Sequence, residues 1–485
     1  MPPHHAPAPL SKRILFPALA VLLTSVLAGG GRGGLGDVLA QLLALFLLAV
    51  LAWSAWSGRI VWRAPLWVRC LPLLVLALPL AQLLPIPADA WASGTARAEV
   101  AAQLSIAGIP SAGRWTLYPL ATERALWFLL PPIALFLAAL ALSERALRWL
   151  FVALILMAML NVCVGVAQLA QGPESPLRLY VPTNIEHAVG LFANRNHFAG
   201  LLAMLLPLTL AGTAWSLVRR KGNGERDFIL PALGAMLSVL LVLGIAFSRS
   251  RAGLGLALIG MLALAPLAWS LPARRGTKRI LAAILVAGLL VATQFASLDA
   301  ARRAMADPVD AGRRQYAATT VDAARAYSPL GSGLGTFRFA YQPFEAARGD
   351  PGRDVVNHAH NDYLELWLEG GVLALLVLLA SAAVWAWAGL RAWRRPTASG
   401  GAIEWQGYVA RACWVAISLA ALHEAFDYPA RTTAFSSAFA LILATLFAHL
   451  RYAAPAAVAK VRAPELVAPG NLAKLRPFRQ APRKE

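Results

Sequence analysis

The densest run of ionisable side chains in the chain lies between Asn357 and Gly371. It closes a long hydrophilic segment and continues directly into an apolar one. Asp362, followed three residues later by Glu365, predicts a capping box, so a helix is expected to begin there. His360 would then lie just before a helix N-terminus, where backbone N–H groups and the positive end of the helix dipole attract anions. A histidine beside an anion site is a candidate for chemistry at neutral pH.

Arginines lie in three other polar clusters, two of them beside apolar segments and the third within the large hydrophilic segment. They are Asn194-Arg195-Asn196-His197, Ser248-Arg249-Ser250-Arg251 and Arg313-Arg314. Arginines at membrane depth are costly and usually mark functional pathways, and a planar guanidinium suits bidentate phosphate binding. Alternatives remain open at this point. The arginines of the second cluster could extend to lipid headgroups, and His197 and His360 could simply satisfy helix starts.

A metal or nucleotide site is not expected from these residues. His358, His360 and Asp362 bring nitrogen and oxygen donors together, but a metal site needs further ligands in a defined geometry, and the arginines would repel a cation. The sequence has no GxxxxGK phosphate-binding loop, which argues against an energy-driven pump. Glu365 and Glu369, one helical turn apart, could position an acceptor or neutralise nearby arginines. We expect no metal and no cofactor.

The composition places these clusters in an all-α polytopic membrane protein. Of 485 residues, 59% are hydrophobic and 14% are charged, and the mean hydropathy is +0.60. The three cysteines lie far apart in apolar segments and offer no disulfide framework. About twelve apolar segments approach the ~20 residues that a spanning helix needs. They are residues 14–30, 35–56, 66–84, 124–142, 147–170, 198–217, 228–247, 252–271, 280–296, 365–390, 406–425 and 433–452.

Basic residues predict the orientation of these spans. With twelve spans, every lysine falls on the side of both termini, which is therefore expected to be cytoplasmic. The one large hydrophilic segment, residues 297–364, lies between the predicted ninth and tenth spans on the opposite side. Within it, Gly312 to Arg325 has a composition compatible with a helix, and Ser328 to Gly335 is rich in turn residues.

Several of these motifs, in this order, resemble the O-antigen ligase and polymerase family. The matching stretches are Asn194 to Gly200, Ser248 to Gly253, Arg313 to Tyr316, Ser328 to Phe337, and His360 to Leu364 leading to Glu369-Gly370-Gly371. The resemblance covers about residues 180 to 445. The spans before it are matched only by number and hydropathy.

The resemblance implies a membrane glycosyltransferase of the GT-C type, working on the periplasmic face without metal or ATP and inverting the anomeric centre. The donor would be a glycan on undecaprenyl diphosphate. By position, His360 would be the base or would orient the acceptor, and Arg251 and Arg313 would bind the diphosphate. Arg195 and Arg249 would be secondary. The remaining expected substrate-binding residues are Arg314, Asn196, His197, Asn361, Asp362 and Glu365.

The apolar segments and basic residues, together with the resemblance over about residues 180 to 445, give an expected organisation and location. Residues 1–13 would be a cytoplasmic tail, 14–171 the first five spans, 172–452 the catalytic region with spans six to twelve, and 453–485 a basic cytoplasmic tail. The protein would lie in the bacterial inner membrane. Its partners would be the lipid-linked donor, a glycan or lipid A-core acceptor and membrane lipids, and no nucleic acid.

Four functions remain open from the sequence. The first is ligation of a finished glycan to lipid A-core in lipopolysaccharide biosynthesis, and the second is polymerisation of O-antigen or exopolysaccharide repeat units. The third is transfer to a protein hydroxyl, which the absence of a large periplasmic domain after the last predicted span disfavours. A lipid-linked glycan transporter would spread its charges through several spans, whereas here they gather at one face.

Overall fold

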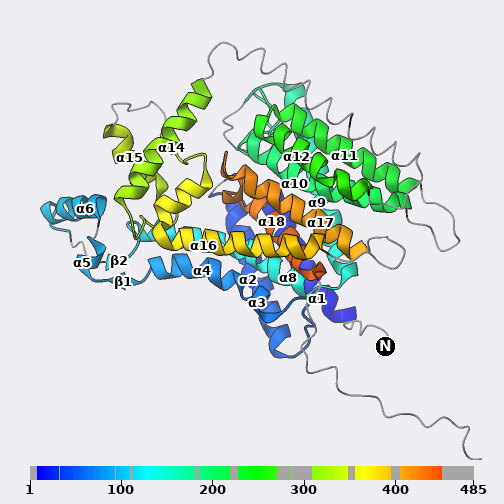
Figure 1. The fold of residues 1–485 in the computed structure, drawn as a ribbon, viewed down its shortest axis with the longest axis horizontal. Helices are drawn as coiled ribbons and strands as arrows, with labels where there is room; N and C mark the ends of the chain where they lie inside the picture. Colours follow the sequence, from blue (N-terminus) through cyan, green and yellow to red (C-terminus); the bar gives the residue numbers. More distant parts are fainter. Residues whose placement is uncertain are drawn as a thin grey trace, which may run out of the picture. The chain divides into compact units, whose positions relative to one another are not determined.

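The computed structural model describes residues 8–31, 33–92, 94–109, 113–180, 185–218, 228–269, 286, 308–347, 355–394 and 405–450. These residues form an α-helical membrane protein (Figure 1). In this described part, strand structure is limited to β1 (Pro85–Ile86) and β2 (Gly113–Arg114), which pair antiparallel. The all-α fold class is therefore confirmed.

Nine helices precede residue 172 in the described part. They are α1 (Ala8–Ala28), α2 (Leu35–Trp56), α3 (Leu66–Arg69), α4 (Leu71–Gln82), α5 (Ala88–Trp91), α6 (Thr95–Ile106), α7 (Pro119–Phe128), α8 (Leu130–Ala141) and α9 (Glu144–Gln171). The predicted spans 66–84 and 124–142 are each a pair of helices. Both pairs break just before prolines, which cannot donate a helical hydrogen bond.

The helices after residue 172 carry the predicted site. They are α10 (Arg195–Val218), α11 (Ile229–Ser248), α12 (Arg251–Trp269), α14 (Pro308–Ala326), α15 (Phe337–Ala347), α16 (Asp362–Trp393), α17 (Trp405–His423), the short 3-10 helix η1 (Pro429–Arg431) and α18 (Thr433–His449). α14 confirms the helix expected between Gly312 and Arg325. The turn-rich stretch that follows it contains Gly331, Gly333 and Gly335, all with positive φ.

Six helical segments in the described part, one of them the α7–α8 pair, are long and apolar enough to cross a membrane. They are Leu35–Trp56, the α7–α8 pair Pro119–Ala141, Glu144–Gln171, Arg195–Leu217, Ile229–Ser248 and Asp362–Trp393. Every other predicted span except one also coincides with a helix. The exception, 280–296, lies outside the described residues apart from position 286, and the predicted tail 453–485 and parts of the segment 297–364 also lie outside them. The count of twelve spans and the placement of that segment stay predictions.

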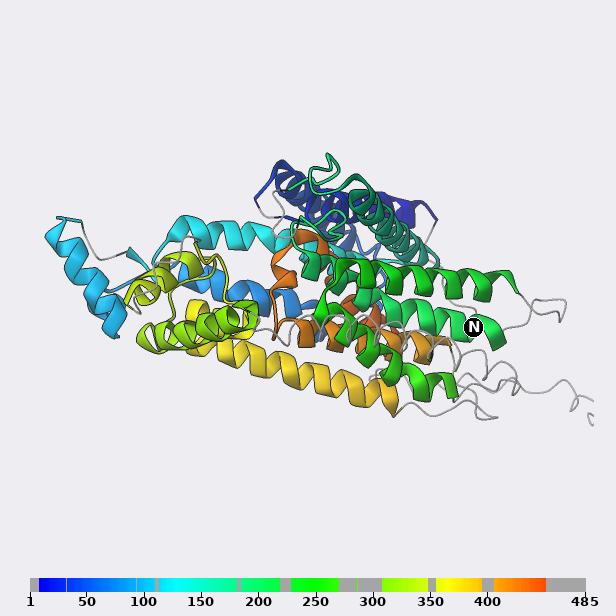
Figure 2. The same cartoon turned by 90° about the horizontal axis from the view of Figure 1, so that it is seen from above.

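Helix α10 is the most enclosed of the six, and it packs against α11, α12 and α17 (Figure 2). A second set of contacts joins α1 to α2, α9 and α18. α10 packs against α17, and α17 packs against α18. Helix α10 also contacts η1, which lies in the polar connection between α17 and α18. These contacts fix the position of that connection. The polar groups of the site are therefore held by tightly packed helices.

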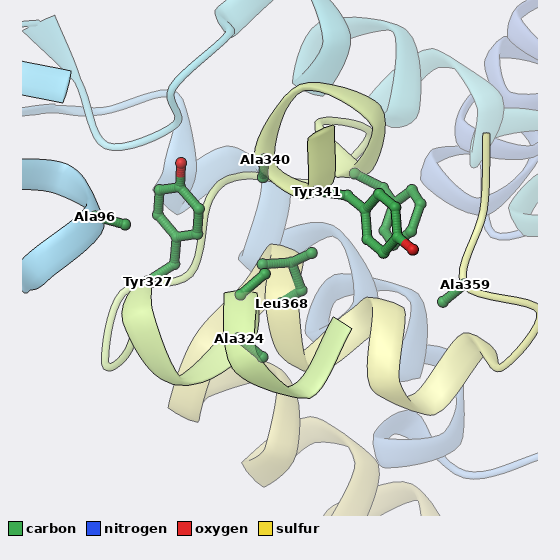
Figure 3. Packing of buried hydrophobic residues seen from close by; sticks show 9 residues of the cluster. Ala96, Ala324, Tyr327, Ala340, Tyr341, Ala359 and Leu368 are labelled. Atoms are coloured by element: carbon green, nitrogen blue, oxygen red, sulfur yellow. The ribbon is translucent and has the colours of Figure 1, made fainter. Parts of the chain in front are cut away.

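Outside this bundle, α6, α14, α15 and α16 share a small apolar core. Figure 3 shows Tyr327 between Ala96 of α6 and Leu368 of α16, with Ala340 and Tyr341 of α15 beside them. All five residues are buried. This core attaches the polar segment before α16 to helices on both sides of it in the sequence.

Candidate functional site

Helix α16 begins at Asp362, as the sequence predicts, but its cap is different. Asn361 is the N-cap residue, and its side chain accepts a hydrogen bond from the N–H of Leu364 at 3.1 Å. The predicted capping box between Asp362 and Glu365 is therefore wrong. The Asp362 carboxylate instead pairs with Arg431, and Glu365 accepts the N–H of Ala359 at 2.9 Å.

The buried carboxylate of Asp427 is the point where the predicted residues meet. It lies in the connection between α17 and η1. Its Oδ1 is 3.1 Å from Nδ1 of His360 and 3.7 Å from Nε2 of His197. Its Oδ2 accepts a hydrogen bond from Asn196 at 2.6 Å and lies 4.0 Å from Nη2 of Arg313. Residues from α10, α14 and the segment before α16 thus converge on one carboxylate.

The ionisation of Asp427 follows from these neighbours. Burial acts to raise the pKa of its carboxyl group, because burial disfavours the charged form. The imidazoles of His197 and His360 outweigh burial and hold the pKa of Asp427 well below its usual range. The carboxylate is therefore charged at neutral pH and can orient and stabilise an imidazolium.

The backbone and two aromatic rings hold His360 in place. Its φ of 51° lies in the left-handed region, which side-chain-bearing residues seldom adopt and which is strained. The ring of Tyr316 stacks on its imidazole with centroids 6.1 Å apart, and Tyr428 meets it edge-on at 5.1 Å. When Nδ1 donates its proton to Asp427, Nε2 carries the lone pair of a base.

Asn196 also connects this centre to the step between α11 and α12. Its Oδ1 accepts a hydrogen bond from the hydroxyl of Ser250 at 2.8 Å, while its Nδ2 binds Asp427. As predicted, there is almost no loop here: α11 ends at Ser248 and α12 begins at Arg251. Arg249 caps α11 with a left-handed φ of 51° and is exposed, and Arg251 is half-buried.

The other predicted arginines lie around the same region. Arg195 is the first residue of α10, next to Asn196. Burial lowers the pKa of His187, and the positive charges of Arg195 and Arg249 lower it further. Arg314 is exposed and follows Arg313 on α14. The sequence did not single out His187.

A second charged centre, which the sequence analysis missed, forms around Arg431. Its side chain is 12% exposed, and its guanidinium pairs with Asp362, with Glu365 at 2.9 Å and with Glu369 at 3.0 Å. Burial acts to lower the pKa of Arg431, but the three carboxylates outweigh burial and raise it well above its usual range. Of the two uses expected for the glutamate pair, neutralising an arginine is the one that these contacts show.

His358 is buried beside this second centre, where it supports the turn before α16. Its Nδ1 lies 2.8 Å from Oε1 of Glu365, and the ring of Tyr428 lies 4.0 Å from its own. Tyr428 therefore contacts His197, His358 and His360. One tyrosine thus packs between the two charged centres.

Asp427, Tyr428 and Arg431 share one signal in the sequence. They belong to the run His423 to Arg431, which places five ionisable residues between two apolar spans. The cost of charge at membrane depth, which draws attention to the arginine clusters, applies equally to this run.

The site combines a proton acceptor, the imidazole of His360 paired with Asp427, with arginine side chains that can bind negative charge. A carboxylate–imidazole pair can take a proton from a hydroxyl group, and nearby guanidinium groups can stabilise an anion that forms during a reaction.

Residues 236–379 match the family model described as O-Antigen ligase. This match confirms the resemblance to that family, and its range includes Arg249, Arg251, Arg313 and His360. The residues Asn196, His197, Asp427 and Arg431 lie outside the matched range. No match was found among curated proteins.

Proposed function

We propose, from the family match and this site, that the chain is a periplasmic-face glycosyltransferase of the inner membrane. It moves a glycan from undecaprenyl diphosphate to an acceptor hydroxyl, and lipid A-core is the acceptor that we propose first. One observation carries the proposal. His360 Nδ1 lies 3.1 Å from one oxygen of Asp427, and Arg313 Nη2 lies 4.0 Å from the other.

In the proposed reaction, Nε2 of His360 accepts the proton of the acceptor hydroxyl. The hydroxyl oxygen attacks the anomeric carbon of the donor sugar as the bond from that carbon to the diphosphate oxygen breaks. Attack from the face opposite the leaving group inverts the anomeric centre. The electron pair of the broken bond leaves with the diphosphate, which already activates the donor, so the reaction uses no metal and no ATP.

Arginines supply the charge stabilisation in this proposal. Arg313 and Arg251 bind the diphosphate, and Arg195, Arg249 and Arg314 assist at its edges. Fixed positive groups aimed at developing negative charge stabilise a transition state most where water is excluded. Arg313 is partly buried, with 30% of its side chain exposed, which suits a group that must bind a substrate anion.

Asp427 is a positioning residue in this reaction. It fixes the tautomer of His360 and stabilises the imidazolium that forms when the proton is taken. Asn196 donates a hydrogen bond to Oδ2 of Asp427, and His197 lies near Oδ1, the oxygen that His360 also contacts. Asn361, Asp362 and Glu365 shape the acceptor side of the site through the helix cap and through Arg431.

Purified protein tests this proposal directly. Wild-type protein, His360→Ala and Arg251→Ala are incubated with a lipid-diphosphate-linked glycan and purified lipid A-core, and transfer is followed by mass change of the acceptor. We expect transfer by the wild type and transfer slower by roughly a hundredfold or more by the variants, at equal amounts in the membrane. Full activity of both variants would overturn the proposed roles.

The acceptor is tested in a deletion strain through its lipopolysaccharide profile. Loss of all capped chains while lipid-linked polymer accumulates supports the ligase proposal. Retention of chains with a single repeat unit would instead identify a polymerase, and unchanged lipopolysaccharide with lost exopolysaccharide would place the enzyme in another polymer pathway.

A further inference from the structure

Helix α16 is broken nine residues after it begins. Gly371 has φ 56° and ψ −145°, which is not helical, so the hydrogen bonds of the helix are interrupted there. The carbonyls of Leu368 and Glu369 instead accept N–H groups of Ser332 and Gly333 at 2.9 and 2.8 Å. On the far side of the break, the N–H of Val372 binds the carbonyl of Pro329 at 2.9 Å. A turn from another segment thus replaces the missing helical bonds.

This contact is possible because glycines face each other. A Cβ atom on Gly331 would lie 2.5 Å from the nitrogen of Gly371. A Cβ atom on Gly371 would lie 2.1 Å from the carbonyl oxygen of Pro329. Both residues have positive φ, which only glycine adopts at no steric cost. The two backbones therefore pack directly against each other.

Two buried polar side chains from the first third of the chain hold the outer side of this turn. Gln82, at the end of α4, donates to the carbonyl of Glu369 at 2.9 Å and accepts the N–H of Leu334 at 2.8 Å. Arg97 of α6 donates through Nη2 to the carbonyl of Gly331 at 2.5 Å. Both side chains are 0% exposed. α4 runs beside α16 (Figure 1).

Arg97 is the less expected of the two. Its hydrogen-bond acceptors within the described residues are all backbone carbonyls: Gly331, Trp115 at 2.8 Å and Trp91 at 3.5 Å. The indole of Trp91 lies 5.5 Å from the guanidinium carbon. Burial lowers the pKa of Arg97 to about 10. Burying a charged group without a carboxylate partner costs free energy. Filling space alone therefore does not account for an arginine at this position.

The turn that Gln82 and Arg97 hold is connected through α16 to the candidate site. The part of α16 before the break carries Asp362, Glu365 and Glu369, which hold Arg431, and it directly follows His360. Glu369 takes part in both arrangements: its carbonyl binds Gln82 and the turn, and its carboxylate binds Arg431. Moving the turn therefore moves the segment that carries the site.

We propose that Arg97 and Gln82 are positioning residues that, through the 329–334 turn, hold the first part of α16 and with it His360 and Arg431 in the geometry for glycan transfer. The consequence for transfer rests on the proposed function. The anchoring does not, and it is measured separately. This gives α4 and α6 a specific part in the site.

The first measurement is hydrogen exchange, followed by mass spectrometry, on the full-length protein in detergent. Arg97→Met and Gln82→Met keep side-chain bulk and remove the hydrogen bonds, whereas Arg114→Met removes an exposed arginine of the same region whose partner is Glu123. We expect faster exchange at residues 329–334 and 362–372 in the first two variants only. No change at these residues in either variant overturns the anchoring, and so does an equal change throughout the protein.

The second measurement is glycan transfer, with rates divided by the concentration of folded enzyme. We expect Arg97→Met to lower kcat about tenfold or more, since small misplacements of reacting groups are costly. KM for the lipid-linked donor stays within about twofold of the wild type because the donor arginines of α12 and α14 are untouched. Arg97→Lys restores part of kcat. Arg114→Met matches the wild type.

The two proposals fail in distinguishable ways. If exchange rises at 329–334 while kcat is unchanged, and His360→Ala is inactive, the positioning proposal is overturned and the proposed function stands. If His360→Ala keeps full activity, the proposed function is overturned, and the exchange data alone decide whether Arg97 and Gln82 anchor α16. If Arg97→Met does not fold, Gln82→Met and Arg97→Lys carry both measurements.

Discussion

His360 and Arg249 share a backbone conformation that residues with side chains seldom adopt, each with φ of 51°. In the described part of the chain, they are the non-glycine residues with positive φ. Such a conformation persists only where the surroundings enforce it, and it occurs often at functional sites. For His360 the surroundings are Asp427, Tyr316 and Tyr428, so three side chains fix one imidazole.

Replacing His360 tests its proposed role most directly. Removing a general base typically costs roughly a hundredfold to ten-thousandfold in rate. We expect His360→Ala to lower kcat of purified enzyme within that range, with the amount in the membrane unchanged on immunoblots. Loss of the protein from the membrane would instead mean that this residue is needed for folding.

Arg313 and Arg325 offer a matched pair on α14. Arg313 lies near Asp427, whereas Arg325 is exposed in the last turn of the helix. We expect Arg313→Ala to lower the transfer rate roughly a hundredfold, comparable to removing one donor that stabilises a developing anion. Arg325→Ala is expected to keep the wild-type rate. Equal effects of the two substitutions would argue against a specific role for Arg313.

The depressed pKa of Asp427 predicts how stability depends on pH. Because the folded pKa lies below the unfolded value of about 3.9, the ionised carboxylate stabilises the fold above that pH. This contribution is lost as pH falls through the folded pKa. We expect wild-type Tm to exceed that of Asp427→Asn at pH 7, and the difference to shrink below about pH 4. A difference that is constant with pH would contradict the assignment.

Sequence reasoning reached part of this centre and could not reach the rest. His360, Arg313, Asn196 and His197 were predicted from motifs, and the structure brings all four to one place. The run His423 to Arg431 carries a charge signal, but the sequence does not tell which of its members contacts the predicted residues, so Asp427 was missed. Its importance comes from tertiary packing, which joins it to residues 67 and 231 positions away.

At the scale of elements, the sharpest features are two abrupt changes of direction. The α11–α12 step was predicted because only four residues separate the apolar segments 228–247 and 252–271, which leaves no room for a loop. The break in α16 was not predicted, although Gly370 and Gly371 were noted. Two glycines permit a break but do not require one, and the turn that occupies this break lies about forty residues earlier in the chain.

Gly371→Ala tests that break against an unconstrained control. The new Cβ would meet the carbonyl of Pro329 at 2.1 Å, so we expect a clear fall in Tm of the detergent-solubilised protein. At Gly255, inside α12, a built Cβ meets no atom within 4 Å among the described residues beyond its chain neighbours and the helix's own nearby backbone. Gly255→Ala should therefore leave stability unchanged or raise it by up to about 1 kcal/mol. Equal Tm values for the two variants would show that the Gly331–Gly371 contact is not needed.

At the scale of the whole molecule, hydropathy gave the membrane class and the helix positions well. Long apolar segments have few alternatives to helix in a bilayer, so α9, α10 and α11 begin within three residues of their predicted starts. Hydropathy does not tell which side of the membrane each connection faces. That orientation depends on the distribution of lysine and arginine over many connections. The location of the site on the periplasmic side therefore stays a proposal.

Cysteine labelling tests that sidedness on two exposed positions. The three natural cysteines are first removed. Arg325→Cys, on α14, and Arg394→Cys, after α16, are then made separately, and each variant is treated with a membrane-impermeant maleimide. We expect labelling of position 325 in cells with a permeable outer membrane. Position 394 should react only after the inner membrane is broken. Labelling of both from outside would contradict the predicted orientation.

The direct bonds between Gln82 and Glu369 and between Arg97 and Gly331 join positions 287 and 234 residues apart. During synthesis, the glutamine and the arginine leave the ribosome long before the glycine turn and the broken helix that they hold. The final shape of α16 is therefore one of the last events of biogenesis, completed only when late segments dock onto early ones. The enzyme would become competent near the end of its own assembly, after most of its helices are already in the membrane.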